Sequence, residues 1–237
     1  MDAGLLPALS LGFLFGLQHA TDSDHVVAVA TIVSRTRRFD AGALIGAFWG
    51  IGHTATIATV GMAIIVFNIT VTPSVGLTME LAVALMLMGL GIFRVVRAVR
   101  ERSEAPHAAP PATHGLRGVL ETVGRAQAAR SVGIGLVHGL AGSAAVALLV
   151  LSTVRSPYAA LAYLVLFGLG TIVGMTAITA LLSLPFTAPL PALNRVLALG
   201  TGVLSFGFGL YLTVQIGFVD GLLVSNPLWG HPVWTPR

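Results

Sequence analysis

The chain has 237 residues, of which 55% are hydrophobic and only 9% are charged, and its mean hydropathy is +0.90. Soluble domains carry roughly 25% charged residues, so this composition excludes an ordinary soluble domain and indicates a polytopic membrane protein. The formal charge is +4. Its arginines lie mostly between apolar segments, a pattern that orients a protein in a lipid bilayer and does not indicate a nucleic-acid partner.

Six apolar segments are candidate membrane-spanning helices, since about 20 apolar residues are needed to cross a bilayer. They cover residues 4–33, 41–67, 76–99, 131–154, 158–183 and 193–216. We therefore predict an all-α polytopic membrane protein with six transmembrane helices. The predicted units are a first three-helix repeat at 1–100, a cytoplasmic linker at 101–130, and a second three-helix repeat with a C-terminal tail at 131–237.

The first segment contains the sequence His-Ala-Thr-Asp-Ser-Asp-His at residues 19–25. An ionisable group at bilayer depth costs roughly 2.5 to 3.5 kcal/mol to insert, so the cluster requires a bound ion or paired partners. On a regular helix His19, Asp22 and His25 form a slanted row about 9 Å long, and Asp24 points away from it. Because that row is too long for both imidazoles to reach one ion, we expect the first helix to be interrupted at this motif.

Two further imidazoles lie inside predicted spans, His53 in the second and His138 in the fourth. A lone buried histidine is usually structural, but these two accompany the histidines and aspartates of the first segment. We predict one shared metal site with the candidate ligands His19, Asp22, Asp24, His25, His53 and His138. The chain has no cysteine, and imidazole with carboxylate but no thiolate suits Ni²⁺, Co²⁺, Zn²⁺ or Fe²⁺.

The two halves of the chain resemble each other at a shift of 118 or 119 residues. The matching segments are residues 16–20 with 135–139, 48–54 with 166–172, and 89–91 with 207–209. A nearly constant shift over three segments predicts a duplication of three helices. Because each half has an odd number of spans, the second would cross the membrane in the opposite sense, and inverted repeats place binding sites near the midplane. His19 and His138 are equivalent in this repeat and could face one another across its axis.

Eleven of the 13 basic residues flank the ends of the predicted spans that lie on one side, which leaves Arg155 and Arg237 on the other. The positive-inside rule places the arginine-rich side in the cytoplasm and both termini outside.

The motifs resemble those of the nickel/cobalt transporter superfamily. Residues 19–26, His-Ala-Thr-Asp-Ser-Asp-His-Val, are similar to its signature His-Ala-Val-Asp-Ala-Asp-His-Ile, and Gly52-His53-Thr54 is similar to its Leu-Gly-His-Ser element. The segment 138–143 resembles one in the six-span, urease-associated branch of nickel permeases. In eight-span members Arg usually stands at the position of Gln18.

This resemblance implies a multi-pass protein of the bacterial cytoplasmic membrane that transports Ni²⁺ or Co²⁺ and is linked to the maturation of a nickel enzyme. It places the four ionisable residues of the first-helix motif in the metal site, with His53 beside them. The ion is then the cargo, and no resident cofactor is expected.

The leading hypothesis is a transition-metal permease that is not an enzyme, and two alternatives stay open. One is an exporter or sensor that uses the same residues, including as a proton relay. The other is an intramembrane metal-dependent hydrolase, with a metal-activated water and Asp22 or Asp24 as the base. The sequence has no ATP-binding P-loop, so a permease would use gradients, the membrane potential or trapping of the metal inside the cell.

Overall fold

The computed structural model describes residues 5–34, 36, 38–67, 72–100, 115–140, 157–224 and 232. The helices are α1 (Leu5–His19), α2 (Ser23–Val33), α3 (Phe39–Phe67), α4 (Pro73–Arg100), α5 (Leu116–His138), α7 (Pro157–Thr187) and α8 (Pro191–Val214). A π-helical turn, η2 (Gln215–Val219), continues α8. These ranges contain no strand, which confirms the all-α prediction for the described part of the chain.

Within the described ranges, four helices are long and apolar enough to cross a membrane, and they support a membrane location for the chain. The spans are Phe39–Ala63, Pro73–Arg100, Tyr158–Thr187 and Pro191–Val219. They coincide with the second, third, fifth and sixth predicted segments. Of the fourth predicted segment, residues 141–154 lie outside the described residues.

The first predicted segment is interrupted at its polar motif, as expected. α1 ends at His19 and α2 begins at Ser23, so three residues separate the two helices. Asp22, which precedes α2, has an extended backbone with φ −58° and ψ 145°. Aspartate is favoured at this position before a helix, and the break follows the local sequence.

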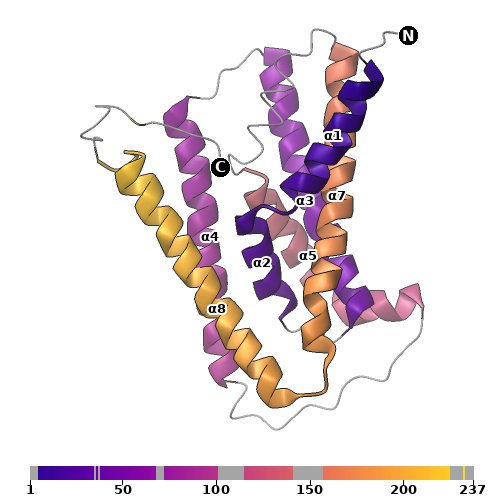
Figure 1. Cartoon of the computed structure of the whole chain (residues 1–237), viewed down its shortest axis with the longest axis vertical. Helices are drawn as coiled ribbons and strands as arrows, with labels where there is room; N and C mark the ends of the chain where they lie inside the picture. Colours follow the sequence, from indigo (N-terminus) through magenta and orange to yellow (C-terminus); the bar gives the residue numbers. More distant parts are fainter. Residues whose placement is uncertain are drawn as a thin grey trace.

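The helix of the fourth predicted segment, α5, begins earlier than predicted. α5 starts at Leu116, so residues 116–130, which we assigned to the linker, are helical. The charges of this segment suggested a linker, but Val119 and Val123 are buried and give it a packed face. Gly124 has φ 65° and ψ 160°, a conformation that favours glycine, and the helix changes direction there (Figure 1).

The helices form two packed groups with α2 between them. α1 packs along α7, α3 packs along both α5 and α7, and α4 packs along α8. α2 contacts α4, α7 and α8. In Figure 1, α4 and α8 cross each other on one side, and α2 lies between this pair and the bundle of α1, α3, α5 and α7.

Glycines allow the paired helices to approach closely, and their contacts recur at the shift found in the sequence. A Cβ atom at Gly16 of α1 would collide with the carbonyl oxygen of Phe167 in α7. A Cβ atom at Gly135 of α5 would collide with the carbonyl oxygen of Trp49 in α3. Gly16 and Gly135 are 119 positions apart, and Trp49 and Phe167 are 118 apart. The same relation holds between α4 and α8, where Gly91 approaches Gly202 and Gly209 approaches Ala84.

The order of these contacts also gives the relative directions of the helices. Gly12 faces Tyr163 and Gly16 faces Phe167, so α1 and α7 run parallel. Gly52 faces Val132 and Gly139 faces His53, so α3 and α5 run parallel as well. Figure 1 shows the first pair descending and the second pair rising.

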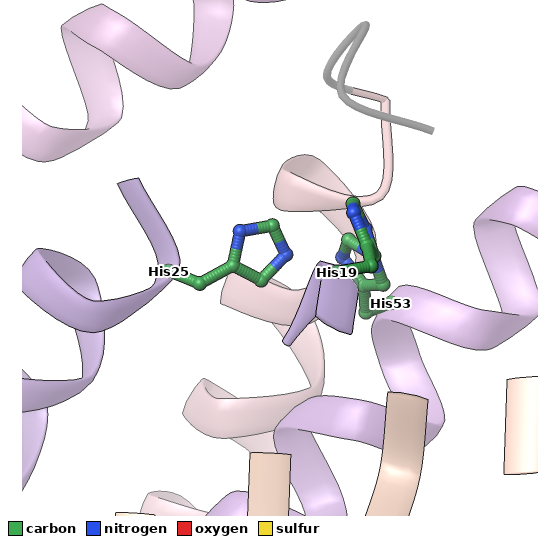
Figure 2. A group of neighbouring side chains, drawn as sticks. All are labelled: His19, His25 and His53. Carbon is green, nitrogen blue, oxygen red and sulfur yellow. The ribbon is translucent and has the colours of Figure 1, made fainter. Parts of the chain in front are cut away.

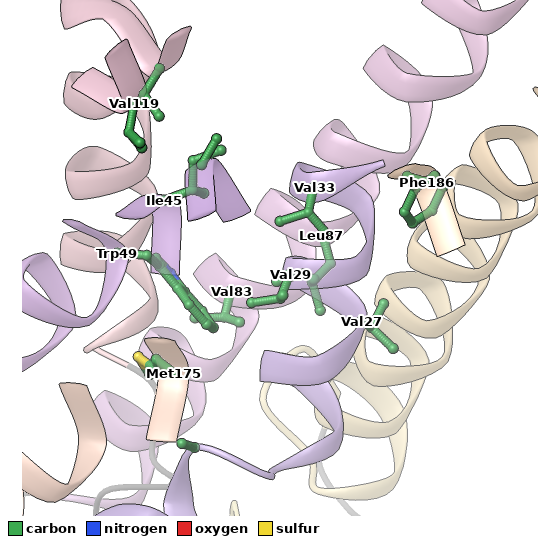
Figure 3. Packing of buried hydrophobic residues seen from close by; sticks show 14 residues of the cluster. Val27, Val29, Val33, Ile45, Trp49, Val83, Leu87, Val119, Met175 and Phe186 are labelled. Atoms are coloured by element: carbon green, nitrogen blue, oxygen red, sulfur yellow. The ribbon is translucent and has the colours of Figure 1, made fainter. Parts of the chain in front are cut away.

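α2 is held by apolar packing and by hydrogen bonds from the α4 and α8 side. Figure 3 shows Val29 and Val33 of α2 beside Leu87 of α4, with Trp49 and Met175 in the same buried cluster. Thr31 Oγ1 donates a hydrogen bond to the Thr201 carbonyl oxygen of α8 at 3.2 Å. At the end of α2, Arg94 of α4 donates hydrogen bonds to Ser34 Oγ at 2.5 Å and to the Ser34 carbonyl oxygen at 3.2 Å. The half-helix is therefore fixed at the end away from its polar motif.

Candidate metal centre

The predicted site residues meet at the break between α1 and α2. His19 is the last residue of α1, and His25 lies in the first turn of α2. A continuous helix would separate them by about 9 Å along its axis. The break instead brings their ring centroids to 4.6 Å. Two imidazoles from one short segment can therefore face a common point.

Three imidazoles form a first cluster, which consists of His19, His25 and His53. His53 comes from α3, and its Nε2 atom lies 2.9 Å from Nε2 of His19. The ring of His25 lies 4.9 Å from that of His53, between centroids, and points from α2 toward the other two rings (Figure 2). All three side chains are buried, and one ligand atom from each lies within 4.8 Å of the others. Three nitrogen donors converge here in a space closed to solvent.

Two aspartates lie against this cluster. Asp22 Oδ2 lies 2.9 Å from His19 Nδ1, and Asp24 Oδ1 accepts a hydrogen bond from His25 Nδ1 at 2.9 Å. In a neutral imidazole, a hydrogen on Nδ1 leaves a lone pair on Nε2. The Nε2 atom of His25 is buried and has no hydrogen-bond partner among the described residues. Carboxylates that hold metal-binding histidines in one orientation are typical of metal sites.

His138, the last residue of α5, contacts the other side of this motif. Its ring centroid lies 4.4 Å from that of His25, and its Nε2 donates to Asp24 Oδ2 at 2.9 Å. Asp24 therefore links His25 to His138. One ligand atom from each of these three residues lies within 4.8 Å of the others, which defines a second cluster. Five of the six candidate residues thus form two groups that share His25, and Asp22 lies against His19. Each of the repeat-equivalent residues His19 and His138 contacts His25.

Two aromatic residues that the sequence reasoning missed line the site. The ring of Trp49 lies 5.3 Å from His25 and 5.5 Å from His138, between centroids. The ring of Phe167 lies 5.5 Å from His19. Trp49 and Phe167 occupy equivalent positions in the repeat, each against the histidine that ends a helix. Their alignment in the repeat was a signal that could have found them.

The candidate metal ligands of the first half are not repeated in the second half of the described chain. The position equivalent to His53 is Thr171, which is buried and donates from Oγ1 to the Phe167 carbonyl oxygen at 2.9 Å within its own helix. The positions equivalent to Asp24 and His25 are Ser143 and Ala144, which lie outside the described residues. The described ligand set therefore comes from the first half together with His138.

Comparisons with known proteins give one relative that matches over almost its whole length. The chain is 35% identical over 225 residues to the urease accessory protein UreH of Bacillus sp. (strain TB-90), an alignment that covers 92% of this chain and 95% of the relative. It is also 26% identical over 218 residues to the chloroplast protein FOR GROWTH AND FERTILITY 2 of Arabidopsis thaliana, with 86% of this chain and 55% of that protein covered. No protein-family model and no solved structure matches the chain.

Proposed function

The chain belongs to the same family as the urease accessory protein UreH, and on this premise we propose that it is a permease that carries Ni²⁺ across the bacterial cytoplasmic membrane. Co²⁺ is the second candidate cargo. The name of the relative supports a link to the maturation of a nickel enzyme. The four apolar helices support a membrane location.

The convergence of three buried imidazoles on one point carries this proposal. Imidazole nitrogen favours first-row transition metals, whereas Mg²⁺ and Ca²⁺ prefer oxygen ligands. Nitrogen ligands bound at about 2.0–2.1 Å to one ion lie roughly 2.9–3.4 Å apart when they are neighbours. The Nε2 atoms of His19 and His53 are already 2.9 Å apart. These two rings would need to move little to bind a common ion.

The two aspartates supply the charge that a divalent ion requires. A bare dication at membrane depth is very unfavourable because the surrounding medium solvates it poorly. Asp22 and Asp24 together carry two negative charges beside the three neutral rings, so the loaded site is neutral overall. A neutral, buried site is well suited to moving an ion between the two sides of a bilayer.

We also propose six crossings in two inverted three-helix halves, with both termini outside. The paired glycine contacts at the constant shift support this arrangement, as do the parallel pairs α1 with α7 and α3 with α5. Inverted halves that rearrange around a midplane site would expose it to each side in turn. The arginine-rich face would lie in the cytoplasm.

Export and hydrolysis are not better supported than uptake. Import and export use the same ligands and differ in driving force, so cellular nickel content on expression separates them, with an increase expected for import. A hydrolase needs a carboxylate free to act as base on a metal-bound water. Both oxygens of Asp24 accept hydrogen bonds from histidines, which disfavours this role for Asp24.

The test is metal flux into liposomes that contain the purified full-length chain. Ni²⁺, Co²⁺, Zn²⁺ and Mn²⁺ are compared, with and without a pH gradient. We expect Ni²⁺ uptake that His53→Gln lowers at least about tenfold, because one direct ligand is lost. Ser131→Ala is the control, since Ser131 is buried and donates a hydrogen bond within its own helix to the Gln127 carbonyl oxygen. Wild-type liposomes that take up none of the four metals would overturn the proposal.

A further inference from the structure

His25 belongs to both clusters of candidate ligands and uses a different ring nitrogen toward each. Its Nδ1 atom lies 2.9 Å from Asp24 Oδ1, on the side of the second cluster. Its Nε2 atom is buried without a hydrogen-bond partner among the described residues. Its ring lies 4.6 Å from that of His19 and 4.4 Å from that of His138, between centroids. One side chain thus connects two possible ion positions.

We propose that the protein holds a single ion that alternates between two positions sharing His25. The first position consists of His19, His25 and His53, and the second consists of Asp24, His25 and His138. This inference rests on the proposed transport function and adds a step to it. The ion would move from ligands on α1 and α3 to a ligand on α5.

The chemistry of neutral imidazole limits occupancy to one ion. A neutral imidazole has one N–H and one lone pair. In the first position the ion takes the Nε2 lone pair of His25, while the Nδ1 hydrogen stays on Asp24. In the second position the ion takes the Nδ1 lone pair, and the hydrogen is carried on Nε2. One neutral ring cannot serve both positions at once, and two dications this close would repel each other strongly.

His138 also keeps one ring hydrogen and one lone pair when an ion occupies the second position. In the described state its Nε2 donates a hydrogen to Asp24, and its Nδ1 atom is buried without a hydrogen-bond partner among the described residues. Binding an ion through Nε2 places the ring hydrogen on Nδ1. Each histidine therefore keeps one ring hydrogen, and no proton is gained or lost in the transfer.

The two positions differ in their direct ligands, so the ion experiences different surroundings in each. The first position offers three imidazoles. Carboxylates contact the Nδ1 atoms of two of these rings, those of His19 and His25. The second offers the Asp24 carboxylate itself as a direct ligand. Loss of His138 should therefore leave the first position intact and block movement into the second.

The first measurement is the number of Ni²⁺ ions bound per wild-type chain. The purified full chain in detergent micelles is titrated with NiCl₂ in a calorimeter and then analysed for metal after dialysis. We expect one ion per chain at saturation. Two tightly bound ions per chain would overturn the inference and leave the transport proposal standing.

The second measurement separates binding from transport with His138→Gln, which keeps an N–H donor for Asp24 but removes the imidazole. We expect Ni²⁺ affinity within about threefold of wild type, because the first position keeps its ligands and their carboxylate partners, while uptake into liposomes falls at least about tenfold. Nickel held by this variant should show only imidazole nitrogen from the protein by X-ray absorption. His53→Gln should lose affinity and uptake together, and Ser131→Ala on α5 should lose neither.

Two results for His138→Gln would contradict the inference. Normal uptake would mean that His138 only positions Asp24 through its hydrogen bond. A loss of affinity as large as that of His53→Gln would mean one composite site. If this variant does not insert stably, His138→Asn is measured in the same way, and the wild-type stoichiometry stands as an independent test. A wild-type protein that binds one Ni²⁺ but transports none would instead remove the proposed function.

Discussion

Arg94 of α4 donates hydrogen bonds to both the side chain and the carbonyl oxygen of Ser34, the residue that follows α2. Arg94 is 5% exposed, so these bonds form away from solvent. His25 lies at the opposite end of α2, and the arginine therefore fixes the helix that carries a candidate ligand. Three kinds of measurement follow from this and related contacts.

Replacing Arg94 should weaken both folding and metal binding. A hydrogen bond from a charged group contributes about 1.5–3 kcal/mol, and lysine cannot reproduce the forked geometry of arginine. We expect Arg94→Lys to lower the melting temperature in micelles and the Ni²⁺ affinity, and Arg94→Gln to lower both further. Arg100→Lys, at the exposed end of the same helix, is the control. A variant at Arg94 with wild-type melting and binding would show that the apolar contacts of α2 and its Thr31 hydrogen bond are enough to hold it.

The glycine contacts predict opposite effects of the same substitution two positions apart on α5. Gly135→Ala would force a methyl group against the carbonyl oxygen of Trp49, whereas nothing lies within 4 Å of a Cβ atom at Gly133. We expect Gly135→Ala to cost about 1–3 kcal/mol of stability, and Gly133→Ala to be neutral or stabilising by up to about 1 kcal/mol. Thermal unfolding in micelles measures both. Equal stability of the two variants would contradict the close approach of α3 and α5.

The aspartates should affect metal binding to different extents. Asp22 contacts one histidine, His19, whereas Asp24 accepts hydrogen bonds from two, His25 and His138. Loss of a carboxylate partner behind a metal ligand typically lowers affinity about 10–100-fold. We expect Asp22→Asn to fall at the low end of this range and Asp24→Asn at or beyond the high end. Calorimetric titration with NiCl₂ tests the order, and a larger effect at Asp22 would reverse our assignment.

Acid should release the metal. Only neutral imidazole binds a metal ion. Protons therefore compete with Ni²⁺ as the pH falls, and the apparent affinity should decrease in acid. Binding measured by equilibrium dialysis at a series of decreasing pH values is the check. Affinity that stays constant or rises in acid would argue against histidine ligation.

The interrupted first helix could be predicted because its cause is local. Four ionisable residues at 19–25 cannot remain in an apolar environment without partners, and a straight helix holds His19 and His25 too far apart. The role of Asp24 could not be predicted in the same way. On a regular helix it points away from the row formed by His19, Asp22 and His25, and its hydrogen bond with His138 joins it to a helix 114 positions away in the sequence.

Other features depend on contacts between distant segments. The 2.9 Å approach of His19 to His53 results from the packing of α1, α3 and α7, which one sequence does not specify. The sequence analysis assigned residues 116–130 to the linker because this segment is charged. The two buried valines that give it a packed face are not evident from that composition. The six crossings stay a prediction, because four spans are found in the described residues and 141–154 lie outside them.

The positions of His19 and His138 as the last residues of α1 and α5 have an electrostatic consequence. The aligned peptide dipoles of a helix place about half a negative elementary charge at its C-terminus and half a positive one at its N-terminus. Among the described residues, two C-termini and one N-terminus, that of α2, meet here, so the described main chain contributes a negative potential. Even without their side chains, these three helix ends together attract positive ions and repel anions such as phosphate.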